Sequence, residues 1–137
     1  MLAACARRHE IRDPVYLCDT FVGVVKASEK DSAYLGGEFA DTSEMVVENL
    51  CQSLRLTNVR ILKGVFPDET ATRWEAKVAV RSCHVKVDVY NSTKDVLEWV
   101  WPRMPAGAIV IFDDYGFSAG RGMIISSTSS VDFLTAT

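Results

Sequence analysis

The sequence predicts an α/β fold with a mainly parallel sheet of about four strands and flanking helices. Short apolar runs alternate along the chain with segments whose apolar residues recur at helical spacing. Because a helical segment separates successive strands, we expect right-handed crossovers between parallel strands. The chain has 137 residues, which suits one domain. We place that domain at residues 1–122 and a weakly structured tail at residues 123–137.

The first half of the chain predicts two strands separated by a loop and a helix. VYLCD (15–19) is a short apolar run that ends in an acid. Residues 20–40 contain several glycines, mixed polarity and no clear period, so they are expected to be mostly loop. Asp41 is then expected to cap a helix, with Glu44 completing a capping box. VRILK (59–63) is the second predicted strand.

The second half predicts two more strands around another helix. CHVKVDVY (83–90) alternates apolar and polar residues, as expected of a strand with one buried face. Ser92 is expected to cap the helix that follows, whose apolar stripe runs from Val96 to Trp101. AIVIF (108–112) is the last strong strand.

Acidic residues gather at the predicted carboxyl ends of these strands. Asp19 ends the first strand, Asp88 lies near the end of the third, and Asp113 and Asp114 follow the fourth. The interval between Asp88 and Asp113 leaves room for one helix, so strands three and four are predicted neighbours. Ligands of parallel α/β sheets bind beyond these strand ends. Several carboxylates at one sheet edge suit a hard divalent cation such as magnesium, which prefers oxygen ligands.

Composition and charge narrow the range of partners. The net charge of −3 makes nucleic acid an unexpected partner. No apolar run approaches the ~20 residues that span a membrane, so no membrane association is expected. The four cysteines are widely spaced, without a CxxC pair or a zinc-type cluster. We therefore expect reduced thiols and a cytoplasmic protein.

Several stretches, taken in order, resemble one enzyme family. VYLCDTFVGV, GGEFADTSE, NVRILKGVFPDET, HVKVDVYNSTKDVLEWVWPRM and IVIFDDYGF are similar to the macrocin O-methyltransferase family. Members are class I S-adenosylmethionine-dependent enzymes that methylate sugar hydroxyls in macrolide antibiotics and related substrates. The resemblance covers roughly residues 13–122. It implies a partial Rossmann-like methyltransferase sheet and a small-molecule acceptor.

The resemblance also implies a cofactor site on the first two predicted strands. The acid that commonly binds the cofactor ribose corresponds to Asp19, with Thr20 beside it. The loop that borders the adenine corresponds to the stretch from Gly64 to Asp68. These residues are the expected contacts for S-adenosylmethionine.

The same resemblance implies metal and catalytic roles on the last two strands. The family holds magnesium at the acidic pair that corresponds to Asp113 and Asp114, and Asp88 and Asp113 are the expected carboxylates that accept the acceptor's proton. The family usually carries an aspartate two residues before Asp88, where this chain has Lys86. An ammonium cannot ligate magnesium and repels it, so we expect Lys86 to pair with the carboxylates and to weaken metal binding. His84 is interpreted as a structural histidine.

A second departure concerns the ends of the chain. The family's first strand and its glycine-rich cofactor loop would precede all the matched stretches, and its C-terminal antiparallel strands are not found here. We therefore expect a chain truncated at its N-terminus, with weak S-adenosylmethionine binding. Loss of a central strand would leave the edges of VYLCD and CHVKVDV unpaired, which favours a homo-oligomer or direct pairing of these strands.

Three functions fit the acidic strand ends. The first is a metal-assisted O-methyltransferase. The second is a non-catalytic methyltransferase-fold remnant that serves as a binding or assembly module. The third is a phosphoryl-transfer domain of doubly wound type, but only the methyltransferase family explains every matched stretch.

Overall fold

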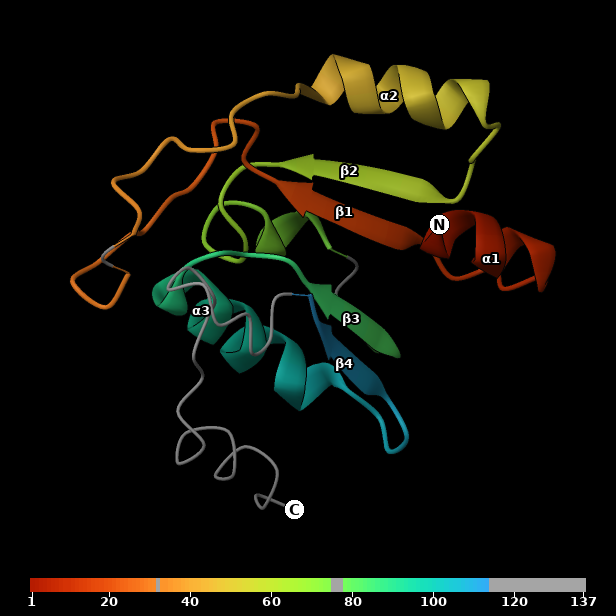
Figure 1. Ribbon diagram of the computed structural model, residues 1–137. Helices are drawn as coiled ribbons and strands as arrows, with labels where there is room; N and C mark the ends of the chain where they lie inside the picture. Colours follow the sequence, from red (N-terminus) through yellow and green to blue (C-terminus); the bar gives the residue numbers. More distant parts are fainter. Residues whose placement is uncertain (32, 75–77, 114–137) are drawn as a thin grey trace. The chain divides into compact units, whose positions relative to one another are not determined.

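The computed structural model describes residues 1–31, 33–74 and 78–113. The chain divides into two compact units. Unit 1 comprises Met1–Gly23 and Gly37–Lys77, and unit 2 comprises Val24–Gly36 and Val78–Thr137. Each unit contains one pair of parallel strands with helices (Figure 1). The α/β class and the parallel pairing are therefore confirmed, although the described strands form two two-stranded sheets rather than one four-stranded sheet.

The strands of unit 1 have the predicted bounds. β1 (Val15–Asp19) pairs in parallel with β2 (Val59–Lys63). The ladder ends where the Gly64 N–H donates to the Asp19 carbonyl oxygen at 2.9 Å. The turn residues that follow the two strands therefore start side by side at the carboxyl end of this sheet.

The helix α2 (Glu44–Ser53) lies along β2 and begins at a different cap from the one predicted (Figure 1). The N-cap is Ser43, whose hydroxyl oxygen accepts the Val46 N–H at 3.4 Å. The capping box led by Asp41 is therefore wrong. Aspartate and serine are similarly good caps, so the local sequence alone could not decide between two candidates two positions apart.

A short helix at the chain start is held against the end of α2. α1 (Leu2–Arg8) precedes β1. Nη1 of Arg7 donates to the carbonyl oxygens of Leu54 at 3.1 Å and Arg55 at 2.6 Å. These carbonyls follow the last helical residue of α2, where backbone acceptors lack intrahelical partners and favour a cation. Arg7 thus acts as a C-terminal cap for another helix.

The strands of unit 2 are neighbours, as predicted. β3 (Ser82–Val85) pairs in parallel with β4 (Ile109–Phe112). The prediction of one strand over 83–90 is wrong in its length. The Asp113 N–H donates to the Val85 carbonyl at 3.3 Å, and beyond it the described residues offer no further ladder partner. The alternating pattern therefore continues past the last paired residue.

The helix α3 (Tyr90–Val100) continues into a 3₁₀ turn, Trp101–Arg103. The predicted cap, Ser92, instead lies buried within the first turn. The helix begins earlier because Asp31, from the loop after β1, accepts the Tyr90 N–H at 2.8 Å through its Oδ1. A side chain distant in sequence thus satisfies a helix N-terminus that the local residues leave open.

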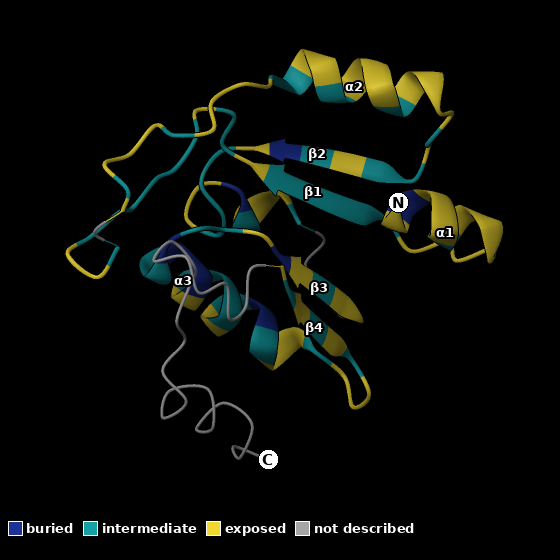
Figure 2. Cartoon of the chain, viewed as in Figure 1, coloured by how far each residue is buried: buried dark blue, intermediate teal, exposed yellow. Residues whose placement is uncertain are grey.

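Each unit has its own buried apolar side chains. In the described residues they are Ala3 and Leu62 in unit 1, and Val80, Val85, Val89 and Val100 in unit 2. By contrast, α2 has no buried residue and exposes much of its surface (Figure 2). Its exposed apolar side chains include Met45, Val46 and Leu50.

Candidate functional site

The carboxyl end of the β1–β2 sheet holds the predicted cofactor residues. Asp19 is exposed, and its Oδ1 accepts the Phe21 N–H at 2.7 Å. Within the described residues its Oδ2 has no hydrogen bond. Thr20 is used differently: its hydroxyl donates to the Gly23 carbonyl at 3.0 Å and accepts the Val22 N–H at 3.3 Å. Asp19 therefore has an oxygen available for a ligand hydroxyl, whereas Thr20 shapes the turn.

The loop after β2 requires glycine at its first position. Gly64 has a φ of +131°, and a Cβ there would lie 2.6 Å from Oε2 of Glu69. That same oxygen accepts the Val65 N–H at 2.8 Å and closes the loop on itself. Asp68 is exposed in this loop. Glycine thus brings the loop backbone to the adjoining end of β1 without displacing the Glu69 carboxylate.

Aromatic packing fixes the far end of this loop. Trp74 stacks on Tyr16 of β1 with ring centroids 4.0 Å apart and planes 16° from parallel. Phe66 contacts the same indole at 5.4 Å in a tilted arrangement. The Arg73 guanidinium donates to the Lys63 carbonyl oxygen. Trp74 was not predicted as part of the site, because its stacking partner lies far away in sequence.

Unit 1 also has an open cavity of about 520 Å³ beside β2 and α2. Its lining includes Tyr16, Cys51, Gln52, Arg60, Ile61 and Arg73. None of the residues predicted for the cofactor is part of this lining. The cavity is therefore separate from the predicted ribose and adenine contacts.

At the end of the β3–β4 sheet, a lysine and a histidine converge on one carboxylate. Lys86 Nζ donates to Oδ2 of Asp113, confirming the predicted ion pair. His84 Nε2 lies 3.6 Å from the other oxygen, Oδ1. The hydrogen bond and charge of Lys86, and more weakly the nearby imidazole, lower the pKa of Asp113 below its ordinary value of 3.8. Asp113 is therefore a stable anion at neutral pH.

The other predicted base, Asp88, lies in the irregular segment between β3 and α3 and is half-buried. The Tyr34 hydroxyl donates to its Oδ1 at 3.5 Å. Tyr34 belongs to the long loop after β1, which is part of unit 2 at this point. The structure therefore places Asp88 with Tyr34, a partner that the sequence did not predict.

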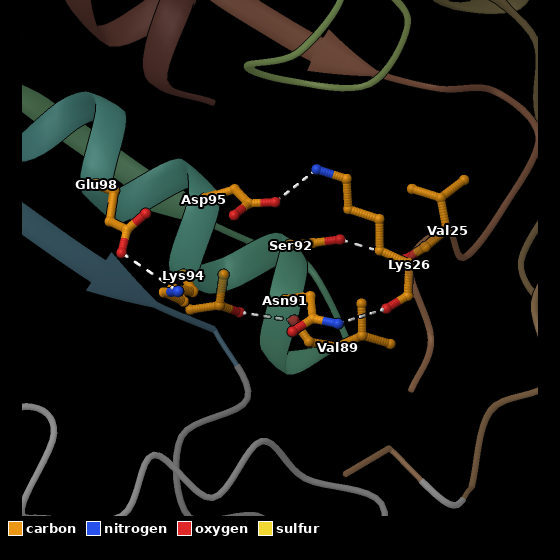
Figure 3. Close-up of polar contacts among 9 residues, drawn as sticks. Val25, Lys26, Val89, Asn91, Ser92, Lys94, Asp95 and Glu98 are labelled. Atoms are coloured by element: carbon orange, nitrogen blue, oxygen red, sulfur yellow. Dashed lines mark hydrogen bonds and ion pairs between the residues drawn. The ribbon is translucent and has the colours of Figure 1, made fainter. Parts of the chain in front are cut away.

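The same loop is fastened to the first turns of α3 (Figure 3). Lys26 Nζ pairs with Oδ2 of Asp95 at 2.5 Å. Asn91 Nδ2 donates to the Lys26 carbonyl at 3.4 Å, and the Ser92 hydroxyl donates to the Val25 carbonyl at 3.3 Å. These contacts bind the unit 2 part of the predicted loop 20–40 to the surface of α3.

The described residues do not fit the magnesium site that the resemblance implies. They contain no group of three or more His, Cys, Asp or Glu side chains that could hold a metal ion. Asp113 carries the Lys86 ammonium, and Asp88 is hydrogen-bonded to Tyr34. Asp114, the second predicted ligand, lies outside the described residues. By contrast, the exposed carboxylate of Asp19 fits the ribose hydroxyls of S-adenosylmethionine.

Comparisons with known proteins all find O-methyltransferases. The family model Macrocin-O-methyltransferase (TylF) matches residues 1–129. Demethyldecarbamoylnovobiocin O-methyltransferase of Streptomyces niveus is 29% identical over 125 residues, covering 84% of this chain and 47% of that protein. Mycinamicin III 3''-O-methyltransferase of Micromonospora griseorubida is 30% identical over 127 residues, covering 84% and 49%.

A solved structure agrees with these relatives. The O-methyltransferase NovP matches with a TM-score of 0.76 and 26% identity, over 96% of this chain and 55% of NovP. The partial Rossmann-like fold predicted from the sequence is therefore confirmed. The chain spans about half or less of the length of the curated relatives it matches.

Proposed function

The chain belongs to the macrocin O-methyltransferase (TylF) family, and on that premise we propose that it takes part in S-adenosylmethionine-dependent methylation of a hydroxyl group on a sugar or other natural product. The observation that carries the proposal is the junction of Asp19 and Gly64. Asp19 ends β1, Gly64 directly follows β2, and the two share a 2.9 Å backbone hydrogen bond at the sheet edge where α/β folds bind ligands.

On the cofactor side, Asp19 would accept hydrogen bonds from the ribose hydroxyls through its unengaged Oδ2. The loop from Gly64 to Asp68 would border the adenine. When bound, S-adenosylmethionine supplies a methyl group on a sulfonium, which is a strong alkylating centre. Asp19 and the loop hold and orient the nucleoside end of that cofactor.

On the acceptor side, Asp88 and Asp113 are the proposed carboxylates that receive the hydroxyl proton. Asp113 is kept anionic by Lys86 and His84, so it serves better as a fixed negative charge than as a base. Asp88 accepts a hydrogen bond from the Tyr34 hydroxyl. Of the two carboxylates, it is the better candidate for the base that receives the proton. No step is assigned to a metal ion, because the described residues do not fit one.

Binding of S-adenosylhomocysteine to the chain, followed by calorimetry or ligand-detected NMR, tests the cofactor assignment. Asp19→Ala should lower the affinity about tenfold, the effect of losing ~1.4 kcal/mol. Asp41→Ala, which removes an exposed aspartate before α2, is the control. Equal affinities of the two variants would show that Asp19 does not hold the ribose.

Methyl transfer itself is measured with tritiated S-adenosylmethionine and a glycosylated natural product with free sugar hydroxyls. Transfer that depends on Asp88 would support the catalytic proposal. Binding of the cofactor product without any transfer would instead favour a non-catalytic binding module, the alternative that the acidic strand ends leave open.

We also propose that the chain self-associates. Met45, Val46 and Leu50 expose 54–66% of their surface on one helix, and exposed apolar patches of this kind commonly mark interaction sites. Light scattering after size exclusion should give at least a dimer mass, and Leu50→Glu should lower it. A monodisperse wild-type monomer would contradict this proposal.

None of the helices in the described part of the chain is long and apolar enough to cross a membrane. A cytoplasmic location and the lack of a nucleic-acid partner stay predictions.

A further inference from the structure

Lys86 places a positive charge where the resemblance implies a metal ion. We propose that the Lys86 ammonium is the built-in cation of this strand end and replaces a divalent metal, so that the carboxyl end of the β3–β4 sheet functions without magnesium. The use of this cation toward an acceptor rests on the proposed function. The exclusion of the metal does not, and it is tested separately below.

The position follows from the register of the β3–β4 sheet. Val85 is the last residue of β3 and pairs with Phe112, the last residue of β4. The next residue is Lys86 after β3 and Asp113 after β4. The two side chains meet there, and Oδ2 of Asp113 receives the ammonium. His84 approaches the remaining oxygen of the same carboxylate. Both oxygens of Asp113 therefore lie near a side-chain nitrogen.

Electrostatics decides which cation this arrangement holds. The ion pair is partly exposed, with side-chain exposures of 64% for Lys86 and 40% for Asp113, so its effect on stability is small. Its effect on a second cation is larger. An ammonium about 4 Å from a divalent ion repels it enough, even in water, to lower the affinity about thirtyfold. Magnesium also gives up its hydration water reluctantly. One carboxylate that is already paired with an ammonium does not compensate for the loss of that water.

An ammonium can perform part of the task of a metal ion. It has three N–H donors, so it can hold Asp113 and an acceptor oxygen at the same time. A positive charge beside a hydroxyl favours loss of its proton. In the transfer, the sulfonium would give its methyl group to the acceptor oxygen and become a neutral thioether, and the hydroxyl proton would go to Asp88, the carboxylate proposed to receive it. Lys86 remains protonated throughout.

The test compares manganese binding to the wild-type chain and to three variants. Mn²⁺ is titrated against each protein, with free ion followed by electron paramagnetic resonance and the location followed by line broadening of Val85 and Asp113 amide signals. Lys86→Met removes the cation without adding a ligand, and Lys86→Asp also adds a carboxylate. Lys94→Asp makes the same change of net charge on α3, where Lys94 pairs with Glu98 at 3.5 Å.

We expect no site-specific broadening in the wild-type chain at millimolar Mn²⁺. Lys86→Met, which removes this repulsion, should bind Mn²⁺ about thirtyfold more tightly than wild type, and Lys86→Asp, which also adds a ligand, should bind it more tightly still. Lys94→Asp should behave like wild type. Tight wild-type binding at Asp113, or equal affinities for wild type and Lys86→Asp, would overturn the proposal. Equal gains in Lys86→Asp and Lys94→Asp would also overturn it, because they would show a general charge effect. These measurements need no methyl transfer. They therefore test whether Lys86 excludes a metal ion independently of the proposed activity.

Discussion

Asp31 is the residue through which the long loop after β1 sets the start of α3. Its Oδ1 accepts the Tyr90 N–H at 2.8 Å. Its Oδ2 accepts both the backbone N–H of Ser28 at 3.1 Å and the Ser28 hydroxyl at 2.7 Å. Replacing Asp31 with alanine therefore removes three hydrogen bonds and the negative charge at a helix N-terminus.

The expected cost in the free energy of unfolding follows from these contacts. Loss of an N-terminal cap costs about 1 kcal/mol, and loss of the charge–dipole interaction about 0.5 kcal/mol. The Ser28 contacts add about 1 kcal/mol, because Asp31 is only half-buried. Asp31→Ala should thus destabilise the chain by about 2–3 kcal/mol, which lowers the Tm by about 10 °C for a chain of this size. Asp31→Asn keeps the Oδ1 acceptor and should cost about 1 kcal/mol.

The measurement is urea denaturation followed by circular dichroism, together with amide hydrogen exchange in the first turn of α3. Glu29→Ala is the matched control, since Glu29 is an exposed acid of the same loop and its loss should change stability by less than about 0.5 kcal/mol. If Asp31→Ala and Glu29→Ala unfold at the same urea concentration, or if the Tyr90 amide keeps its protection in Asp31→Ala, then Asp31 does not cap α3.

Three further outcomes follow from single contacts. Ser43→Ala should cost about 1 kcal/mol of stability, whereas Asp41→Ala should cost close to nothing; the reverse order in denaturation would restore the cap predicted from sequence. Gly64→Ala forces a Cβ against a carboxylate of its own loop at a positive φ and should cost at least about 2 kcal/mol, read from the melting temperature. Burial raises the pKa of the Cys83 thiol to about 11, so at neutral pH iodoacetamide should label Cys83 far more slowly than the exposed Cys5; equal labelling by mass spectrometry would contradict the burial.

The strands could be predicted from the sequence because their signal is local. VYLCD and VRILK are compact apolar runs, and both have the predicted bounds. Their parallel pairing followed from the helical segments between strands. The length of β3 could not be predicted in the same way. The alternation of residues 83–90 describes which side chains are buried, whereas strand length depends on how far the partner strand continues.

The helix caps and the aromatic contacts show where local sequence information ends. Tyr90 receives its cap from Asp31, 59 residues earlier in the chain. Trp74 finds Tyr16 across the loop after β2. Neither pairing can be predicted from the neighbouring sequence, because each depends on how the fold brings distant residues together. Ser92 was a reasonable local cap, but its hydroxyl is needed to hold the loop instead.

The meeting of Lys86 and Asp113 could be predicted because two simple rules combine there. Parallel neighbours bring residues at their carboxyl ends to the same sheet edge, and the register of β3 and β4 makes these two the first residues beyond the ladder. The backbone fixes the place, and the side-chain type decides its chemistry. A carboxylate after β3 would help to bind a cation beside Asp113, whereas a lysine provides the cation itself. On the proposal that Lys86 replaces the metal ion, the residue after β3, and not the fold, decides whether this strand end binds a metal.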